Sequence, residues 1–446
     1  MILQNWWYTT LLGIQEQMRP PLEADLKTDV LVIGGGAAGL SAACRLMHQG
    51  LKVILLEKNI CGGSSTGKSA GFLTPDSELE LSQLIRRFGV KGARELWSVP
   101  VRGIEIMLGL VKKYEISCDL LTQDSLFLGI GSSGWEDIKE EIEARKKMGF
   151  DSQLYHREEL SKIIGSTSYS GAVRYAKTYG VDALLYSQGL KHALLADGVQ
   201  IFEASEVHSV KGHRAETHGG SVTADQIIFC ADKLKPRISR FAANVYHAQT
   251  FLSISEPITD REFQELFPSG PLQCWDSTLV YSYFRPTGDQ RLLLGGGSML
   301  TTFSRHDHTE PNIIERVIGG FKKRFPKLTN LQFIQYWPGR IDTTRDLLPT
   351  VARDPNAPHI HFVLGCVGLP WATFCGDFAA RHAIDNHWED DHYYQYFRDD
   401  RMFFMSLAME KIFGKQIVFS LNNAWAKYYQ VDQKKLCPKK EASDVS

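Results

Sequence analysis

The stretch of sequence that decides the fold is VLVIGGGAAG, residues 30–39. Its four leading apolar residues predict a fully buried strand, and the glycines that follow have the spacing G-x-G-x-x-G. Apolar residues then recur at helical spacing, and a second apolar run, Val53–Leu56, predicts another buried strand that is followed by Glu57. We therefore expect a strand, a helix and a second strand in succession, with an acidic residue at the end of the unit.

This unit has the features of a dinucleotide site. Gly34 would permit the tight turn, Gly36 would let the backbone approach a pyrophosphate, and Gly39 would let helix and strand pack closely. The N–H groups of the helix N-terminus would face the phosphates, and the Glu57 carboxylate would accept hydrogen bonds from a ribose. A glycine-rich turn that binds no ligand is the alternative interpretation.

Composition places the chain among globular proteins. It has 446 residues, enough for two domains, of which 43% are hydrophobic, and its formal net charge is −1. Because there is no basic excess, the sequence predicts no nucleic-acid partner. No apolar run approaches the roughly 18 residues that span a bilayer, and the N-terminus lacks the pattern of a signal peptide. We expect a cytoplasmic enzyme.

The cysteines and histidines predict neither disulfides nor a metal site. None of the 8 cysteines belongs to a C-x-x-C pair, which indicates free thiols in a reducing compartment. The pairs His306/His308 and His359/His361 have no nearby Cys or carboxylate at the spacing of a metal site.

The order of element types along the chain indicates two domains. Patterns of α/β type occur at the start, in the middle and near the end, whereas helical stretches at 78–117 and 136–164 and a β-rich block at 245–340 interrupt them. The predicted fold is of the α/β (α+β) class, with a Rossmann-like dinucleotide domain built from discontinuous segments and a β-rich substrate domain. The expected boundaries are an N-terminal extension at 1–25, a dinucleotide domain at 26–80, 165–240 and 341–390, a substrate domain at 81–164 and 241–340, and a helical C-terminal tail at 391–446.

Two further segments favour FAD over NAD as the dinucleotide. The run GGSSTGKSAG, residues 62–71, follows the second strand, and its small and hydroxyl residues suit a second backbone cradle along an extended cofactor. Late in the chain, Gly365 to Trp371 follow a strand and begin an expected helix, in which Pro370 is well placed as the first residue. The N-terminus of that helix would face an anionic flavin edge, unless the turn is an ordinary helix start.

With these motifs in order, the chain resembles the D-amino-acid oxidase-like family of FAD enzymes, which includes glycine, sarcosine and D-amino-acid oxidases. Within that family it resembles the gamma-glutamylputrescine oxidoreductases in particular. The resemblance rests on residues 67–71, where Arg, Asn and Gly are more usual at 68 to 70, on the late Gly-x-x-Gly turn and on a pattern Trp-x-Gly…Thr-x-Asp…Pro. The residues that match this last pattern are Trp337, Gly339, Thr344, Asp346 and Pro349.

The resemblance implies a set of cofactor contacts. It places the FAD pyrophosphate on the first glycine-rich turn, the adenosine ribose on Glu57, and the flavin along the second cradle and the late turn. Val207 would lie near the adenine, and Ala231 would close the second cradle. The expected cofactor-binding residues are Gly34, Gly36, Ala37, Ala38, Gly39, Glu57, Lys58, Ser65, Thr66, Lys68, Ser69, Ala70, Gly71, Val207, Ala231, Gly339, Gly365, Gly368, Leu369 and Pro370.

The sequence departs from the family pattern at several positions. Leu369 and Pro370 stand where a Gly-His-Gly-like turn is usual, which removes one backbone donor, and Asp232 stands where Gly or Asn is usual. Relatives that hold flavin covalently carry a linking His near the position of Lys68 or a Cys near that of Gly339. Neither linking residue is present, so the resemblance implies noncovalent FAD.

The family reaction is hydride transfer from a C–H bond next to an amine nitrogen to flavin N5, after which the imine hydrolyses. A deprotonated amine can itself expel the hydride, so no side-chain base is required and no catalytic residue is assigned. Three side chains are candidate substrate contacts, each with a plainer alternative. Arg340 would hold a carboxylate or form a surface ion pair, Tyr283 would roof the flavin or pack in the core, and Trp371 would cover the flavin or only pack.

Several electron acceptors remain open. The glycine run 295–297 lacks the G-x-G-x-x-G spacing and a following helix, and we expect oxygen, a quinone or a carrier protein as acceptor rather than bound NAD(P)H. The alternative enzymes are a membrane- or quinone-linked FAD dehydrogenase, with peripheral contact at the inner face of the membrane, and an NAD(P)H-using flavoprotein. A FAD-stabilised binding protein is the non-enzymatic alternative.

A membrane or partner contact would use the apolar residues of the C-terminal tail, which otherwise pack on the body. These residues are Phe403, Phe404, Leu407, Ile412, Phe413, Ile417, Val418, Phe419 and Trp425.

Overall fold

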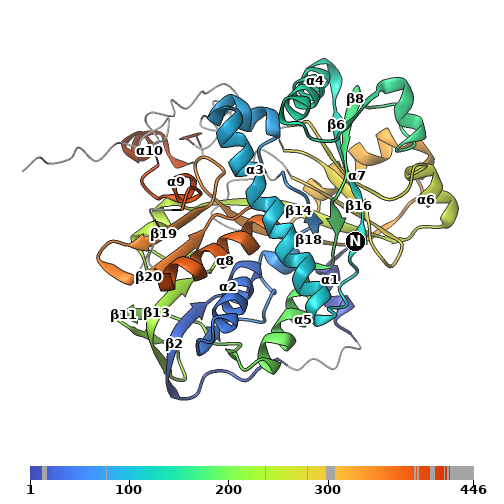
Figure 1. Cartoon of the computed structure of the whole chain (residues 1–446). Helices are drawn as coiled ribbons and strands as arrows, with labels where there is room; N and C mark the ends of the chain where they lie inside the picture. The colour runs from blue at the N-terminus through green and yellow to red at the C-terminus, as the bar shows by residue number, and fades with distance from the viewer. Residues whose placement is uncertain are drawn as a thin grey trace, which may run out of the picture.

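The structure, a computed structural model, confirms the predicted α/β (α+β) class. Within the residues that it describes, the strands form three sheets of nine, eight and three strands, with helices packed on them (Figure 1). The described residues are 1–12, 18–76, 78–236, 238–278, 280–297, 307–385, 388, 391–401, 407–415, 417–418 and 421.

The glycine-rich turn belongs to the eight-stranded sheet. Its strands are β2 (Asp25–Ile33), β3 (Val53–Leu56), β10 (Gln200–Phe202), β11 (Ser209–Lys211), β12 (Arg214–Glu216), β13 (Ser221–Phe229), β19 (Thr350–Asp354) and β20 (Ala357–Leu364). The order is β10-β3-β2-β13-β12-β11, and β20 pairs with both β13 and β19. Each neighbouring pair among β10, β3, β2, β13 and β20 is parallel, so the carboxyl ends of these strands meet at one edge. The sheet is thus built from segments far apart in the sequence.

The other two sheets lie beyond this edge. The nine-stranded sheet runs in the order β1 (Ile2–Leu3), β18 (Phe333–Thr343), β14 (Tyr246–Pro257), β17 (Arg291–Gly296), β16 (Tyr283–Pro286), β15 (Leu272–Asp276), β6 (Asp124–Gly129), β8 (Gly171–Tyr175) and β7 (Gln153–His156). The three-stranded sheet runs β4 (Phe72–Leu73), β9 (Tyr179–Gly180) and β5 (Leu121–Thr122). Strand β8 falls within the segment 165–240 but pairs with β6 and β7, and the domain boundaries expected from the sequence stay a prediction.

The helices cover the sheets and join them. They are α1 (Trp6–Thr10), α2 (Ala37–His48), α3 (Leu81–Tyr114), α4 (Gly131–Met148), α5 (Ala183–Ala196), α6 (Asp260–Leu266), α7 (Asn312–Arg324), α8 (Leu369–Asp385), α9 (Tyr394–Phe397) and α10 (Leu407–Phe413), with short 3₁₀ helices at Thr66–Lys68, Arg157–Lys162, Arg240–Asn244 and Pro326–Leu328. Figure 1 shows α3 running from beside α4 down to α5, in front of α8. The helix kinks at Gly89, whose φ of +69° breaks the helical geometry.

Glycines let α8 approach the helices on both of its sides. A Cβ on Gly376 of α8 would overlap the carbonyl oxygen of Ala38 in α2, and a Cβ on Gly103 of α3 would overlap the carbonyl oxygen of Pro370 in α8. Ser41 of α2 also donates a hydrogen bond to the Thr373 carbonyl oxygen at 2.8 Å. The first and last segments of the sheet are therefore held together by direct backbone contact between helices.

The strand–helix–strand unit predicted for residues 30–57 is confirmed, whereas the helical pattern expected at 136–164 is only partly present. Helix α4 ends at Met148 because Gly149 takes a left-handed conformation, with φ of +73°, and stops it. The chain then forms β7, which pairs with β8. Pairing with a strand outside the segment overrides the local helical periodicity, which tertiary contacts commonly do.

The C-terminal segment is attached to the body through α10. Glu410 accepts a hydrogen bond from Tyr246, and its Oε2 lies 3.0 Å from Arg345 Nη2. Ile412 and Phe413 of the same helix are 75% and 48% exposed. The tail residues Phe403, Phe404, Phe419 and Trp425 lie outside the described residues. Contact of the tail with a membrane or partner stays a prediction.

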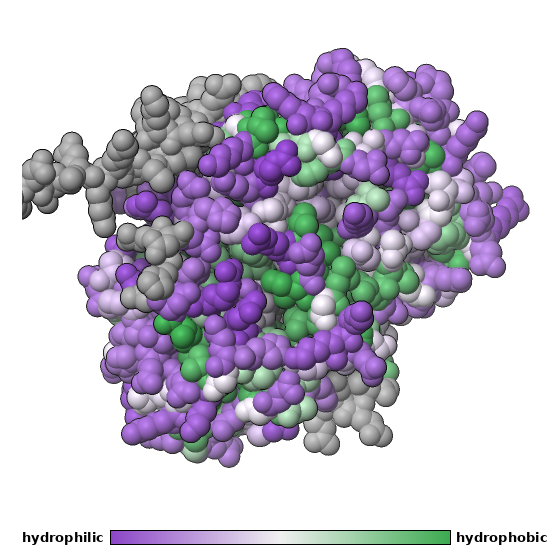
Figure 2. All heavy atoms as spheres, in the orientation of Figure 1, coloured by the Kyte–Doolittle hydropathy of each residue, from purple (hydrophilic) through white to green (hydrophobic). Residues whose placement is uncertain are grey.

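The face shown in Figure 2 is mostly hydrophilic, with hydrophobic residues gathered near its centre, in the region of α3. The partly buried apolar residues of α3 include Ile85, Val90, Val101, Ile106 and Leu108. In the part of the chain that the structure describes, none of the helices is both long and apolar enough to cross a membrane.

The contact between α3 and α8 makes a testable prediction. Gly103→Ala should lower the free energy of unfolding by about 1–3 kcal/mol, because the added methyl group meets the Pro370 carbonyl oxygen. Gly109→Ala on the same helix is the control: a Cβ there meets nothing within 4 Å. That control should be neutral or should stabilise the protein by up to about 1 kcal/mol. Urea unfolding of both variants measures the difference, and equal effects would contradict the close approach.

Candidate cofactor and substrate site

The first glycine-rich turn closes the end of β2 against the start of α2. Gly34 has a φ of +108°, which strains any side chain, and a Cβ there would lie 2.6 Å from the Cys230 carbonyl oxygen. A Cβ on Gly39 would overlap the carbonyl oxygen of Gly34 itself. Glycine at these two positions lets the helix press on the strand end, and Gly36 is the N-cap of α2. The start of α2 is thereby fixed at the edge of the sheet.

Glu57 follows β3 beside this turn, with its carboxylate buried. Its Oε2 accepts a hydrogen bond from the Gly35 N–H at 2.7 Å, and its Oε1 accepts one from the Asn59 N–H at 2.9 Å. Burial raises the pKa of the Glu57 carboxyl, while these hydrogen bonds and the Lys58 cation act in the opposite direction. An ionised carboxylate has about four acceptor sites, so Glu57 can hold the turn and still accept hydrogen bonds from a ribose.

The second cradle folds around the 3₁₀ helix Thr66–Lys68. Thr66 Oγ1 accepts a hydrogen bond at 3.1 Å from the N–H of Ala37, the first residue of α2. Ser65 Oγ donates to the Arg340 carbonyl oxygen in β18 at 2.8 Å. The cradle therefore bridges the start of α2 and the nine-stranded sheet.

The late turn joins β20 to α8. Gly365 and Gly368 have φ values of +66° and +92°, both in the left-handed region that favours glycine. Helix α8 begins at Leu369, so Pro370 is its second residue rather than the first, as the sequence had suggested. Its missing N–H is still harmless, because the first four N–H groups of a helix have no partner within the helix.

These three turns border one cavity of about 1320 Å³, its opening to solvent included. Of the cofactor residues expected from the sequence, those that line it are Gly34, Gly36, Ala37, Ala38, Glu57, Lys58, Ser65, Thr66, Ser69, Val207, Ala231, Gly365, Gly368 and Leu369. Those that do not line it are Gly39, Lys68, Ala70, Gly71, Gly339 and Pro370. A backbone-rich cavity that joins two helix N-termini and a buried carboxylate fits a dinucleotide.

Two of the expected residues outside the cavity lining, Gly71 and Gly339, pack against other backbone groups. A Cβ on Gly71 would overlap the Val181 carbonyl oxygen, so this glycine permits close packing. A Cβ on Gly339 would lie 3.5 Å from the Lys68 carbonyl oxygen. These positions shape the second cradle from its outer side.

Charged residues after β13 also line the cavity, and sequence reasoning missed most of them. Lys233 has a φ of +58°, and its N–H donates to Asp342 Oδ2 at 2.5 Å. Burial raises the pKa of Asp232, with the Asp342 charge acting in the same direction, and burial lowers the pKa of Lys233. The departure from the family pattern at Asp232 was the one available signal. Lining residues that were not expected include Ser64, Ser205, Glu206, Cys230, Asp232, Lys233, Leu234, Lys235, Ile238, Ile341, Cys366 and Ala372.

The three candidate substrate contacts lie apart from the cavity lining. Arg340 Nε is 3.2 Å from Asp307 Oδ1, an ion pair of the kind named as its alternative. Tyr283 packs edge-on against Phe72, with ring centroids 5.9 Å apart. Trp371 is buried in the hydrophobic core that includes α2, α3 and α8. Substrate contact by these side chains stays a prediction.

Two carboxylates that the sequence did not single out lie among aromatic rings next to Phe72. Tyr281 Oη donates to Glu78 Oε1 and Trp275 Nε1 donates to Glu80 Oε1, both at 3.0 Å. The rings of Phe72 and Trp275 are 6.5 Å apart. Burial raises the pKa of Glu78 to about 7 and that of Glu80 well above its ordinary value. Carboxylates and aromatic faces both attract a cationic amine.

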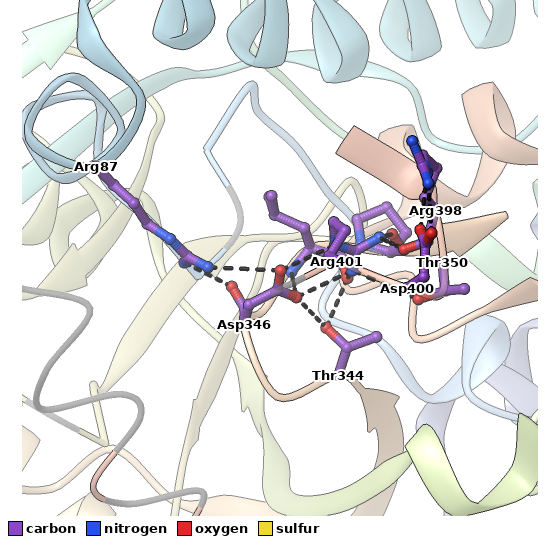
Figure 3. Close-up of polar contacts among 9 residues, drawn as sticks. Arg87, Thr344, Asp346, Thr350, Arg398, Asp400 and Arg401 are labelled. Atoms are coloured by element: carbon purple, nitrogen blue, oxygen red, sulfur yellow. Dashed lines mark hydrogen bonds and ion pairs between the residues drawn. The ribbon is translucent and has the colours of Figure 1, made fainter. Parts of the chain in front are cut away.

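Asp346, from the Thr-x-Asp pattern, lies between two arginines from distant parts of the chain (Figure 3). Arg401 donates to its carboxylate from Nε at 3.0 Å and from Nη2 at 3.1 Å, and Arg87 Nη2 lies 3.5 Å away. Thr344 Oγ1 donates to Asp346 Oδ1 at 2.8 Å. Burial acts to raise the pKa of this carboxyl, but the two arginine charges hold it below its ordinary value. The motif residue thus ties α3, the turn after β18 and the C-terminal segment together.

Within the described residues, no group of three or more His, Cys, Asp or Glu side chains is placed to hold a metal ion. The cysteines in the same ranges are free, and most of them are buried.

Comparisons with known proteins place the chain beside redox flavoproteins. The family model described as FAD dependent oxidoreductase (DAO) matches residues 29–385. Probable oxidoreductase OrdL of Haemophilus influenzae is 28% identical over 365 residues, covering 79% of this chain and 82% of the relative. Gamma-glutamylputrescine oxidoreductase of Escherichia coli is 26% identical over 359 residues, covering 78% and 81%. Glycine oxidase from Geobacillus kaustophilus has the same fold, with a TM-score of 0.73 at 16% identity over 84% of this chain and 100% of that chain.

The buried position of Glu57 makes a prediction for cofactor binding. Glu57→Ala should raise the dissociation constant for FAD at least tenfold, because charge-assisted hydrogen bonds are worth about 1.5–3 kcal/mol each. Quenching of flavin fluorescence by the apo-protein measures the constant. Glu216→Ala, in β12 of the same sheet and away from the cavity lining, is the control and should bind FAD normally. An unchanged constant for Glu57→Ala would mean that the acidic residue does not hold the ribose.

Proposed function

The chain belongs to the DAO family of FAD-dependent oxidoreductases, and from this premise we propose that it oxidises an amine or an amino acid. The observation that carries the proposal is the position of Glu78 and Glu80 among aromatic rings. Along the sequence, Phe72 directly follows the second cradle, and Glu78 and Glu80 come shortly after it. Two of the proteins that this chain resembles, gamma-glutamylputrescine oxidoreductase and glycine oxidase, are named for an amine and an amino acid, which agrees with this proposal.

FAD supplies the redox chemistry when bound, by accepting a hydride from the C–H bond next to the substrate nitrogen. In this proposal, the protein orients the two partners. The turns at Gly34 and Gly365 and the second cradle would hold the cofactor, while Glu78, when ionised, would attract the amine. The aromatic side chains around them exclude water from the reacting carbon. The imine product then hydrolyses.

We further propose that FAD is held without a covalent bond. Lys68 and Gly339 occupy the two positions at which relatives carry linking residues. The expected electron acceptors are oxygen, a quinone or a carrier protein.

Anaerobic reduction of the bound flavin tests the proposed reaction. An amine, an N-methyl glycine or an amino acid should bleach the flavin absorbance, because hydride transfer needs no acceptor beyond FAD. Screening these classes by stopped-flow absorbance identifies the substrate. Above pH 7, where Glu78 is ionised, Glu78→Gln keeps the size of the side chain and removes its charge, so it should raise KM for the cationic substrate while FAD binding stays normal. Bleaching by NADPH and by none of the amines would overturn the proposal.

Arg340 makes a separate prediction about substrate carboxylates. Arg340→Lys should reduce turnover of carboxylate-bearing substrates about tenfold more than turnover of simple amines, since Lys cannot reproduce the two parallel hydrogen bonds of a guanidinium. Asp307→Asn is the matched control, because it removes the ion pair and keeps the arginine. It should leave the preference between the two substrate classes unchanged. If both variants lower both activities equally, Arg340 is structural and another group binds the carboxylate.

A further inference from the structure

The N-terminal segment lies directly behind the second cradle. Strand β1 pairs in parallel with β18, with Ile2 opposite Gln335 and Leu3 opposite Tyr336, at the edge of the nine-stranded sheet. Figure 1 shows the N-terminus beside β18 and α1 close to α5. The family match begins at residue 29, so this segment lies outside it.

Side chains of this segment bind backbone carbonyl groups of the cradle. Asn5 Nδ2 donates to the Gly67 carbonyl oxygen at 2.6 Å, and Trp7 Nε1 donates to that of Ser69 at 2.9 Å. Tyr8 Oη donates to the carbonyl oxygen of Gly63 at 3.1 Å. The Trp7 side chain is only 2% exposed, so its hydrogen bond is shielded from water.

Two residues of the nine-stranded sheet complete the same row of contacts. Trp337 Nε1 donates to the Lys68 carbonyl oxygen at 3.2 Å, and Arg285 Nε donates to that of Ala70 at 2.6 Å. The Trp7 and Trp337 rings pack edge to face with centroids 6.3 Å apart. Four successive carbonyl groups, from residue 67 to residue 70, are therefore each bound by a side chain from outside the cradle.

This arrangement fixes which way the peptide groups of the cradle face. In a trans peptide the N–H points opposite to the C=O. Because Trp7 holds the Ser69 carbonyl group, the N–H of Ala70 points away from the N-terminal segment. Ser69 itself lines the cofactor cavity, and Thr66 Oγ1 contacts the start of α2. The contacts behind the cradle thus set the face that the cradle presents to the cavity.

We propose that Asn5, Trp7, Tyr8 and Thr10 form an N-terminal latch that positions the second cradle for FAD, with Trp7 as its principal positioning residue. The latch holds residues 67–70 in the binding conformation before the cofactor arrives, which removes an ordering cost from FAD binding. Thr10 anchors the far end of the latch by donating to Asp182 Oδ2 at 2.8 Å, and Asp182 caps α5. Because the latch concerns cofactor binding, its test can fail while the proposed amine oxidation holds, and the reverse is also true.

A pair of tryptophan substitutions tests the latch. Trp7→Phe keeps the aromatic packing on Trp337 and removes the Nε1 donor, so the dissociation constant for FAD should rise about tenfold. The absorption maxima of bound flavin should also shift, because the peptide group at Ser69 is free to turn. Trp6→Phe is the matched control: the buried Trp6 Nε1 donates no hydrogen bond among the described residues, and the ring lies against Arg291. This control should retain both the affinity and the spectrum.

Hydrogen exchange of the apo-protein supplies a readout without cofactor. In Trp7→Phe the amides of residues 63–71 should exchange faster, while those of β2 and β3 should keep their protection. Asn5→Ala, which loses the donor to the Gly67 carbonyl group, should show the same local effect and keeps the test decisive if Trp7→Phe fails to fold. Unchanged FAD affinity, spectrum and exchange in the folded variants would overturn the latch.

Discussion

The rest of the structure depends on the contact between α2 and the end of β2. Gly39 sits on the carbonyl oxygen of Gly34, at a separation that no side chain permits. This fixes the start of α2, and α8 then packs on α2 where Gly376 meets Ala38. Helix α8 also begins at the late turn. A continuous series of backbone contacts therefore fixes the position of the first glycine turn relative to the last one. The cavity between them therefore has a defined shape before any ligand binds.

The second cradle obeys a different constraint. It has little regular structure, so most of its carbonyl groups have no partner within a helix or sheet, and a buried carbonyl group without a partner is costly. Asn5, Trp7, Trp337 and Arg285 meet this need from outside the segment. One set of hydrogen bonds therefore gives the cradle carbonyl groups their partners and also joins the nine-stranded sheet to the cofactor side of the molecule.

Buried carboxylates behave differently according to the cations around them. Asp346 has Arg401 and Arg87 beside it, and its pKa lies below the ordinary value. Glu78 has Tyr281 as its partner and no arginine contact among the described residues, so burial dominates and raises its pKa to about 7. Asp346 therefore serves as an ionised link between segments, whereas Glu78 can change its charge near neutral pH. The two sites have opposite electrostatic requirements although both lie in the same chain.

Local patterns explain what could be predicted. The strand–helix–strand unit, its glycine turns and the family were all readable, because the tight turn, the helix start and the buried strands each depend on residues close together in sequence. Of the fourteen expected cofactor residues that line the cavity, most belong to these local turns, whereas Val207 and Ala231 were expected only from the family resemblance. Residues 153–156 were predicted to be helical but form β7, because this strand depends on pairing with β8, which lies outside the predicted helical stretch.

The sequence by itself determined the fold class, the family and the FAD cofactor, since short-range backbone geometry is encoded in runs of glycine and apolar residues. Only the tertiary structure decided that Arg340 meets Asp307, that Tyr281 meets Glu78 across the fold, and that Trp7 supports Ser69. No periodicity or spacing records such contacts. These contacts exist because the folded chain brings together groups that lie tens to hundreds of residues apart. Burial away from water then strengthens each hydrogen bond and charge interaction.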